Sequence, residues 1–587
     1  MTNNSRNIRQ DELKVKKTRI KFQPKTKKAF VEKPLFFILI VLALTFITFL
    51  PSLKNDFISS WDDDLFVINN VLIRHLDFQS VKSIFTTPVY GAYCPLPVLT
   101  FALEYHFFGL NPLPYHISNL ILHLICTLFV FQFFKLLQLN SIYAAFGAIL
   151  FGIHPMNVES VAWITERKDL LYGLFYLASI IVYLKYIRAE DRRINIFIFV
   201  LLLFIFALFS KILAVTLPIS LILIDFYTQR PGKLKLFIEK IPFVVLSLVF
   251  GLAGIFILKE QHILQSSDML SLSEKIFLGL YALSGYIVKF FAPFHLSAVY
   301  PFPKNPAHTL PLLYYLNLFF LLIMGSLVYR TIRHTRVVIF ALLFFLFNVI
   351  FVLQILSAGS TFLADRYSYI SYVGFCFIAG WSVEKFIDKK KELKPFFFSV
   401  MVILIILFMS LTFNRCNIWK NAETLWTDAI EKYPDQVAIP YCNRGSFYND
   451  LKQWDKAISD CSTAIAIEPN FAEPYTNRGV AYANLGEWNK TISDCSRAIE
   501  IDPNFSKEAY SNRGVAYVNF NEWDKAIDDY SRAIRINPNL AEAYLSRGLA
   551  YGAIMELEPA IADFPKRSRS TRKIAKPTPI GKLHSIS

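Results

Sequence analysis

The sequence predicts an all-α protein in two parts: a polytopic membrane helix bundle of about eleven spans, followed by an α-solenoid of short repeats. Three observations support this. The chain has 587 residues, of which 54% are hydrophobic, and a mean hydropathy of +0.40, which is too apolar for an ordinary soluble fold. Between residues 34 and 413, nearly uncharged stretches long enough to cross a bilayer recur. After residue 414, polar residues return and the apolar ones become periodic.

The formal charge of +16 is concentrated at the two ends of the chain. Residues 1–33 carry +8 and residues 566–587 carry +7, so the body between them is nearly neutral. A neutral body offers no basic face to follow a phosphate backbone, which excludes a nucleic-acid partner. We expect 1–33 to be a basic cytoplasmic tail. We expect 566–587 to be a disordered basic tail, which is either an eroded repeat end or a functional arm.

Eleven apolar stretches are predicted to span the membrane and to form a transmembrane domain over 34–413. They lie near 34–53, 115–137, 141–155, 169–187, 194–209, 212–228, 241–258, 311–329, 337–356, 366–386 and 396–413. Basic loops favour the cytoplasmic side. The four most basic loops share that side only if the apolar stretch 274–292 does not cross; if it does cross, there are twelve spans. With eleven spans the N-terminus is cytoplasmic and the repeats lie on the outer side.

Residues 414–565 are predicted to form a solenoid with one partial, three full and one degenerate repeat. Glycines recur about every 34 residues, at Gly445, Gly479, Gly514 and Gly548. Trp and Pro residues recur with the same spacing. This pattern resembles the tetratricopeptide repeat. Cys461 and Cys495 occupy equivalent positions and are expected to be packing residues. Pro565 falls where a helix interior is expected, so the last repeat fails there.

Each full repeat also places an asparagine at the same position of its first helix: Asn443, Asn477 and Asn512. On a concave face these amides could bind an extended peptide backbone. Alternatively, the Asn and Arg residues of the repeats make polar contacts within and between repeats.

Polar side chains gather at the predicted outer ends of the spans. The acidic run Asp62-Asp63-Asp64 follows the first span and suits general-base or metal chemistry, or forms a solvated turn. Further candidates follow along the chain: His154, Glu159, Arg167, Asp169, Lys211, Asp365, Arg366 and Tyr369. Arg and Lys at this interface suit a lipid phosphate, although each alone could snorkel or pair with a carboxylate. Together the clusters indicate a site that opens outward, and the scarcity of ionisable groups inside the spans argues against proton-coupled transport.

The order of these motifs resembles the transmembrane and tetratricopeptide-repeat family. The acidic pair is followed by His154-Pro-x-x-x-Glu159-x-Val, Arg167-x-Asp169, Ser210-Lys211, Asp365-Arg366-Tyr367 and then the repeats. Members of this family are protein O-mannosyltransferases with a GT-C glycosyltransferase fold, so the resemblance implies a GT-C-like domain. Where eukaryotic members typically have Lys-Glu, this chain has Lys211-Ile212. The departure favours a bacterial-type relative, in a bacterial inner membrane rather than the endoplasmic reticulum.

The resemblance also implies roles for the candidate residues. Asp62 and Asp63 would lie at the catalytic centre, one of them acting as base on an acceptor hydroxyl while the sugar leaves a polyprenyl phosphate. Arg167, Lys211 and Arg366 would contact the lipid phosphate, and the other candidates would line the substrate site. The predicted activity is transfer of mannose or a similar sugar to Ser or Thr of a protein held by the repeats. Apart from this lipid-linked donor no cofactor is firmly predicted, although a divalent metal could bind beside Asp62–Asp64.

The competing hypothesis is a non-enzymatic, membrane-anchored scaffold whose repeats assemble protein partners. A simple anchor needs only one span, so a bundle of about eleven counts against it.

Overall fold

The structure is a computed structural model that describes residues 34–189, 193–260, 271–302, 310–332, 335–353, 362–504 and 506–563. In those residues the only β pairing is a single bridge between Val89 and Ala92, so the all-α prediction is confirmed. The two predicted basic tails and Pro565 lie outside the described residues.

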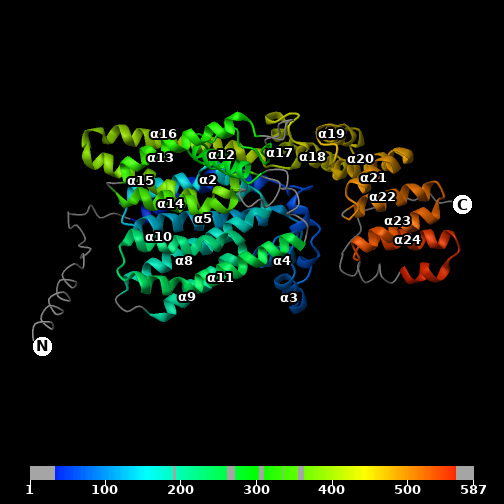
Figure 1. Cartoon of the computed structure of the whole chain (residues 1–587), viewed down its shortest axis with the longest axis horizontal. Coiled ribbons are helices and arrows are strands. Elements are labelled where there is room, and N and C mark those ends of the chain that lie inside the picture. The colour runs from blue at the N-terminus through cyan, green and yellow to red at the C-terminus, as the bar shows by residue number, and fades with distance from the viewer. Residues whose placement is uncertain are drawn as a thin grey trace, which may run out of the picture.

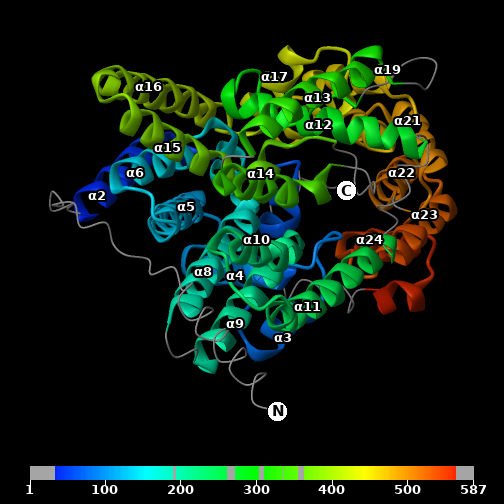
Figure 2. The same cartoon turned by 60° about the vertical axis from the view of Figure 1, so that its left-hand side comes forward.

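The bundle helices run side by side along one direction, and the solenoid leaves from one end of them (Figure 1). Their bounds are α2 (Pro34–Phe49), α3 (Phe78–Thr86), α4 (Pro95–Phe108), α5 (Pro112–Leu136), α6 (Ser141–Gly152), α7 (Val158–Ala162), α8 (Arg167–Arg188), α9 (Ile194–Ser210), α10 (Leu217–Thr228), α11 (Lys233–Glu260), α12 (Leu272–Phe291), α13 (Leu312–Ile332), α14 (Arg336–Val349), α15 (Tyr372–Lys389) and α16 (Lys394–Ile418). Helices α2, α6, α15 and α16 form one side of the bundle, while α8, α9 and α11 form another (Figure 2).

Six helices in the described part of the chain are long and apolar enough to cross a bilayer. A seventh span would combine α6 with α7, which are bent by 49°. The bend falls at His154-Pro155, where proline lacks the N–H that would continue the helix. Every predicted span overlaps a helix, so the polytopic membrane character is confirmed; the count of eleven remains a prediction. Helix α12, which was expected not to cross, is not among the six.

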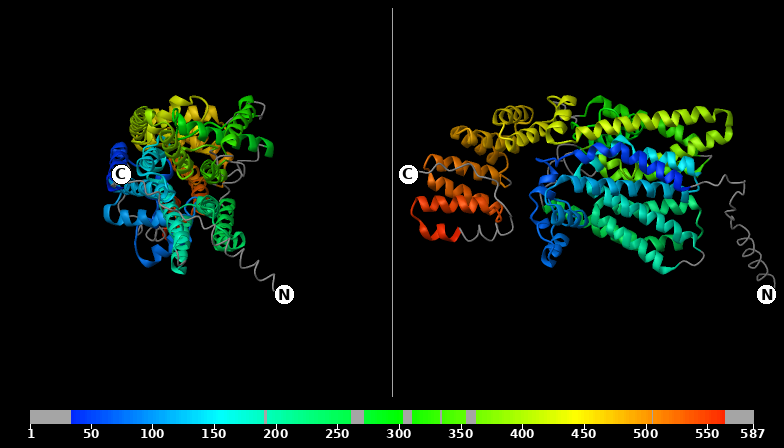
Figure 3. Two further views of the ribbon diagram at one scale, coloured as in Figure 1. Left: turned by 90° about the vertical axis from the view of Figure 1, so that its left-hand side faces the viewer. Right: turned by 180° about the vertical axis from the view of Figure 1, so that it is seen from behind.

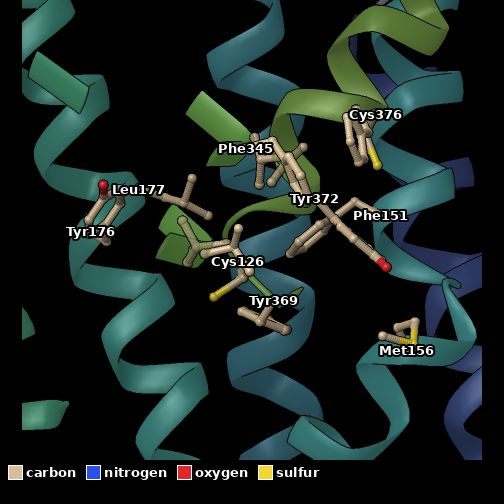
Figure 4. Close-up of a cluster of buried hydrophobic side chains, with 14 of the residues drawn as sticks. Cys126, Phe151, Met156, Tyr176, Leu177, Phe345, Tyr369, Tyr372 and Cys376 are labelled. Atoms are coloured by element: carbon tan, nitrogen blue, oxygen red, sulfur yellow. The ribbon is translucent and has the colours of Figure 1, made fainter. Parts of the chain in front are cut away.

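Helix α8 lies at the centre of the bundle and packs against α5 and α9. Its Tyr176 hydroxyl is bonded to Ser220 at 2.7 Å and to Asn348 at 2.8 Å, so polar groups buried between helices are satisfied. Around it lies a core of aromatic and sulfur-containing side chains (Figure 4). Close packing of α6 on α15 depends on Gly147, where a Cβ would lie 2.7 Å from the Cys376 carbonyl oxygen.

The end of the bundle away from the solenoid is closed by a buried ion cluster. Lys240 Nζ lies 2.7 Å from Asp225, and Arg230 lies 2.9 Å from Glu239. The Tyr183 hydroxyl joins them by donating to Asp225 at 2.7 Å. The two cations pair with the two carboxylates, so this cluster holds helices together.

The solenoid begins beside α12 and α16 and curves across the end of the bundle (Figures 1 and 3). Its helices are α17 (Ala422–Lys432), α18 (Ala438–Asp450), α19 (Trp454–Ile467), α20 (Ala472–Asn484), α21 (Trp488–Ile501), α22 (Lys507–Asn519), α23 (Trp523–Ile536) and α24 (Ala541–Ala553). The repeat glycines allow close pairing within each repeat. A Cβ at Gly445 would lie 2.7 Å from Cys461 Sγ, which confirms that Cys461 is a packing residue.

An arginine in each repeat binds an aspartate on the next helix through two nitrogens. Arg478 Nε and Nη2 lie 2.7 and 2.8 Å from Asp494, and Nη1 donates to Ser462 of the preceding repeat at 2.9 Å. The pattern recurs with Arg444, Arg513 and Arg547. For the arginines, the interpretation as contacts within and between repeats is therefore the one observed.

Candidate functional site

The sequence motifs meet at the end of the bundle from which the solenoid departs. Four connections converge there, and each supplies one charged residue to the same cluster. Asp62 comes from the loop after α2, and Glu166 from the turn before α8. Lys211 lies between α9 and α10, and Arg366 in the turn before α15. The ordered motifs are thus brought together by folding, as the resemblance implied.

The two candidate catalytic aspartates have different environments. Asp63 is fully buried; one carboxylate oxygen accepts from Ile58 N–H at 2.8 Å, and the other accepts from the Thr165 N–H at 3.1 Å and from the Thr165 hydroxyl. Burial raises the pKa of Asp63 to about 7. The Asp62 side chain is 26% exposed and lies 3.2 Å from Lys168 Nζ. Asp63 therefore anchors the loop, and Asp62 is the more accessible of the two carboxylates.

Behind Asp62 lies a network of ion pairs centred on Glu166. Lys168 Nζ lies 3.4 Å from Glu166, Lys211 Nζ lies 3.3 Å from it, and Arg366 Nε lies 3.6 Å from it. Lys211 also contacts Asp169 at 2.6 Å. Three cations around one carboxylate keep Glu166 ionised and fix the relative positions of three separate elements.

A second carboxylate, Glu159, holds Arg366 in place. It accepts from the Arg366 backbone N–H at 2.9 Å and forms an ion pair with the guanidinium. The guanidinium also lies over the rings of Trp163 and Tyr367, at 5.5 and 5.0 Å from their centroids. Such a fixed, stacked arginine is pre-organised to bind an anion.

The network has a layered arrangement. The side chains of Lys168, Lys211 and Arg366 are 10–14% exposed, whereas their partners Glu166 and Asp169 are at most 3% exposed. The cations therefore form the outer layer and the carboxylates the inner one. This cation layer, defined as Lys168, Lys211 and Arg366, lies beside Asp62, and ammonium and guanidinium groups are donors that suit a phosphate group.

Arg167 points away from this network. Its guanidinium donates to Asn119 Oδ1 and to the Tyr115 carbonyl oxygen, both at 2.8 Å, and forms an ion pair with Glu104. The side chain is completely buried. Arg167 thus joins α8 to α4 and α5, and its predicted contact with a lipid phosphate has no geometric support here.

His154 and Tyr369 are also outside the network. His154 receives the Met156 N–H on Nδ1 and bonds to the Phe290 carbonyl oxygen at 3.1 Å. Its ring stacks on Phe290 with centroids 5.3 Å apart. The Tyr369 hydroxyl bonds to His123 at 2.9 Å, and its ring lies in the hydrophobic core beside Cys126 (Figure 4). Both residues shape the bundle around the site and do not line it.

Asp365 faces the opposite side of its turn from Arg366. It accepts from the Tyr300 hydroxyl at 2.6 Å and is buried. Nearby, Lys432 of α17 donates to the Leu296 carbonyl oxygen at 2.6 Å. Asp365 therefore belongs to the contact between the bundle and the base of the solenoid.

Lys168 is the site residue that the sequence motif did not single out. The motif Arg167-x-Asp169 emphasises the first of two adjacent basic residues, but the second one pairs with Asp62. Helix α8 begins only at Arg167, after a tight turn at Ile164–Glu166. That turn sets which basic side chain faces the site, and it carried no separate sequence signal.

Asn443, the first of the three predicted peptide-binding asparagines, contacts the loop of Asp62 through its main chain. The Asn443 carbonyl oxygen accepts from Ser60 Oγ at 2.8 Å, two residues before Asp62. Asn477 Nδ2 lies 3.5 Å from Cys442 Sγ, and its carbonyl oxygen accepts from Asn449 at 2.8 Å. Asn512 lies at the equivalent position of α22 and is half-buried. Peptide binding by these residues remains a prediction.

The acidic run does not fit a divalent metal. The Asp63 oxygens accept three hydrogen bonds, Asp62 is paired with Lys168, and Asp64 accepts from the Ser60 N–H at 2.6 Å. Across the described residues, no group of three or more His, Cys, Asp or Glu side chains could hold a metal ion.

Family models match the repeats in the second part of the chain. The models of the TPR repeat match residues 445–486 and 521–554, and the tetratricopeptide repeat model matches 472–505. The crystal structure of MamA is 27% identical, with a TM-score of 0.23, over 25% of this chain and 86% of that one.

One relative aligns with most of the chain, and others align with shorter parts of it. The Caenorhabditis elegans protein O-mannosyl-transferase F38B6.6 is 26% identical over 464 residues, which cover 74% of this chain and 63% of that protein. Human protein O-mannosyl-transferase TMTC4 is 29% identical over 26% of this chain and 24% of its own length. Human TMTC2 is 36% identical over 16% of this chain and 11% of its own length. This chain thus spans less than two thirds of the length of these relatives. The resemblance inferred from the ordered motifs is confirmed.

Proposed function

We propose that this homologue of the protein O-mannosyl-transferases is a membrane glycosyltransferase that moves mannose or a similar sugar from a polyprenyl-phosphate carrier to a protein Ser or Thr hydroxyl. The observation that carries the proposal is the partly exposed Asp62 carboxylate beside the cation layer, at the end of an apolar bundle. Transfer from a sugar phosphate requires a base and electrostatic support for the departing phosphate. The candidate base, Asp62, and the cation layer that would support the phosphate lie next to each other.

In the proposed reaction, Asp62 accepts the proton of the acceptor hydroxyl as the hydroxyl oxygen attacks the anomeric carbon of the sugar. The bond from that carbon to the phosphate oxygen breaks, and its electron pair leaves with the polyprenyl phosphate. Lys211 and Arg366 stabilise the charge that develops on the phosphate. Lys168 orients Asp62 through the ion pair at 3.2 Å.

A lipid-linked donor fits the location of the cation layer. A polyprenyl carrier stays in the bilayer, so a transferase for it needs spans and a site at their ends. Helices α11 and α13 expose apolar side chains along most of their length, as lipid-facing helices do. The basic loops at the opposite end of the bundle favour the cytoplasm, which supports a site on the outer side of the membrane. The proposed membrane is a bacterial inner membrane.

The acceptor is proposed to reach Asp62 along the solenoid. Ser60, which binds Asn443, lies in the same loop as Asp62. A segment of acceptor protein bound along Asn443, Asn477 and Asn512 would therefore end beside the base.

The test compares Asp62→Asn with a control, Asp77→Asn, in the full-length protein reconstituted with polyprenyl-phosphate mannose and an acceptor peptide. Asp77 is an exposed aspartate in the same outer segment that caps α3 by accepting from Ser80 N–H. Loss of a general base is expected to reduce transfer by about 10²-fold or more, while the control retains activity. Equal transfer by both variants would contradict the proposal, and retained partner assembly with no transfer by the wild type would support the scaffold hypothesis.

A further inference from the structure

The first repeat of the solenoid is incomplete. In later repeats the second helix packs on the glycine of the helix before it, as Cys461 of α19 does on Gly445 of α18. Helix α17 is such a second helix, and Trp426 occupies the position that corresponds to Cys461. Its predecessor is α16, which extends along the bundle (Figure 1). The position of a first helix beside Trp426 is therefore open to another segment.

The loop that carries Asp62 fills this position. Trp61 stacks on Trp163 with centroids 3.9 Å apart and an interplanar angle of 19°. The same Trp61 ring meets Trp426 edge-on at 4.9 Å and lies 6.3 Å from Trp419. Trp163, Trp419 and Trp426 are at most 1% exposed, so Trp61 closes a continuous aromatic core between the bundle and the solenoid.

Backbone contacts reinforce this packing. The Asp56 N–H donates to the Lys420 carbonyl oxygen at 2.8 Å, and Asn55 Nδ2 donates to the Cys416 carbonyl oxygen at 3.2 Å. Ser60 Oγ donates to the Asn443 carbonyl oxygen at 2.8 Å. These three bonds join residues more than 360 positions apart in the sequence. They fix the loop against the start of the solenoid along most of its length.

Asp62 therefore lies between two anchored neighbours. Trp61 is held between Trp163 of the bundle and Trp426 of the solenoid base, and Asp63 is held by Thr165 of the bundle. Because the solenoid fixes one flanking residue and the bundle contacts both, the direction of the Asp62 carboxylate depends on both parts. Removing either anchor would let Asp62 drift from Lys168, and a displacement of about 1 Å can reduce a rate about 10²-fold.

We propose that the base of the solenoid completes the catalytic site, with Trp426 as a positioning residue that fixes Asp62 through Trp61. The expected effect on kcat rests on the proposed transferase function. The expected fixing of the Asp62 loop by the solenoid does not. It predicts that the solenoid acts on turnover itself, in addition to any recruitment of acceptors. A short acceptor peptide at saturating concentration would then still require the solenoid base.

The experiment uses the full-length protein and three variants: Trp426→Leu, Trp426→Phe and Trp488→Leu. Trp488 begins α21 within the solenoid and serves as the matched control. Hydrogen exchange of residues 55–64 is measured together with kcat and KM for a short acceptor peptide. Trp426→Leu is expected to speed exchange in this loop and to lower kcat at least about 10-fold with KM changed less than about 3-fold. Trp426→Phe should keep most of the protection of the loop from exchange and most of kcat. Trp488→Leu should change neither the loop exchange nor kcat.

Ser60→Ala serves as a second variant, because it removes the hydroxyl that bonds to Asn443 and to the adjacent Ser59 carbonyl oxygen, and keeps the aromatic core. It should also speed hydrogen exchange in the loop, but less than Trp426→Leu does. Unchanged loop exchange in both Trp426→Leu and Ser60→Ala would overturn the inference, as would a rise in KM with kcat intact. If the wild type transfers no sugar, the proposed function fails, and loop exchange still decides whether the solenoid positions the loop.

Discussion

Replacing Arg167 by methionine should mainly reduce stability, whereas replacing its neighbour Lys168 should mainly reduce transfer. The buried Arg167 guanidinium bonds to Asn119 and Tyr115 and pairs with Glu104. Removing it leaves Glu104, whose side chain is 10% exposed, without its cation. Breaking a buried ion pair from one side costs about 3–5 kcal/mol. Arg167→Met should therefore lower the free energy of unfolding by several kcal/mol.

Lys168→Met should change stability much less, because Glu166 keeps Lys211 and Arg366 and the Asp62 side chain is 26% exposed. We expect a loss of about 1 kcal/mol. Transfer should nevertheless fall about 10-fold or more, because Asp62 loses the group that orients it.

The assay is thermal unfolding in detergent, followed by tryptophan fluorescence, beside transfer rates measured well below the midpoint. In the double variant Arg167→Met and Glu104→Gln, part of the lost stability should return, because the buried charge is gone. A stable Arg167→Met protein without transfer activity, beside an active Lys168→Met protein, would show that the two basic side chains have been assigned to the wrong sides of α8.

Two further outcomes are expected. Lys211→Met should weaken binding of a polyprenyl phosphate, measured as the inhibition constant of the sugar-free carrier, and unchanged inhibition would remove Lys211 from the phosphate site. For Asp63, the folded pKa of about 7 lies above the ordinary value of 3.8, so the folded state holds the proton more tightly. Its contribution to stability is complete below about pH 4 and is lost as pH rises to about 7, at about 1.4 kcal/mol per pH unit. The difference in free energy of unfolding between the wild type and Asp63→Asn should follow that slope between pH 4 and 7, and a flat difference would contradict it.

The elements of the fold were largely predictable from the sequence, because long apolar stretches and a 34-residue repeat each determine one kind of structure. Helix α4 was missed; it has 14 residues, begins with Pro95 and is too short for a span. The stretch predicted as a span over 141–155 ends earlier, at Gly152, because the chain bends before Pro155. Both differences come from proline at element boundaries, whose effect depends on the neighbouring packing.

The site was predictable as a set of motifs but not as a geometry. The sequence placed Asp62 and Asp63 together, yet Thr165, which buries one of them, lies about 100 residues away. Likewise, nothing in the sequence around Trp61 indicated that Trp426, 365 residues later, would pack against it. Long-range contacts of single side chains are set by the tertiary fold, so periodicity and motif order cannot reveal them.

The most direct test of the account is a structure of the full-length Asp62→Asn variant in lipid with polyprenyl-phosphate mannose bound. We expect the phosphate to contact Lys211 and Arg366, and the anomeric carbon of the sugar to lie on the side of residue 62. Phosphate bound elsewhere, such as at the Asp225–Lys240 cluster at the opposite end of the bundle, would contradict it.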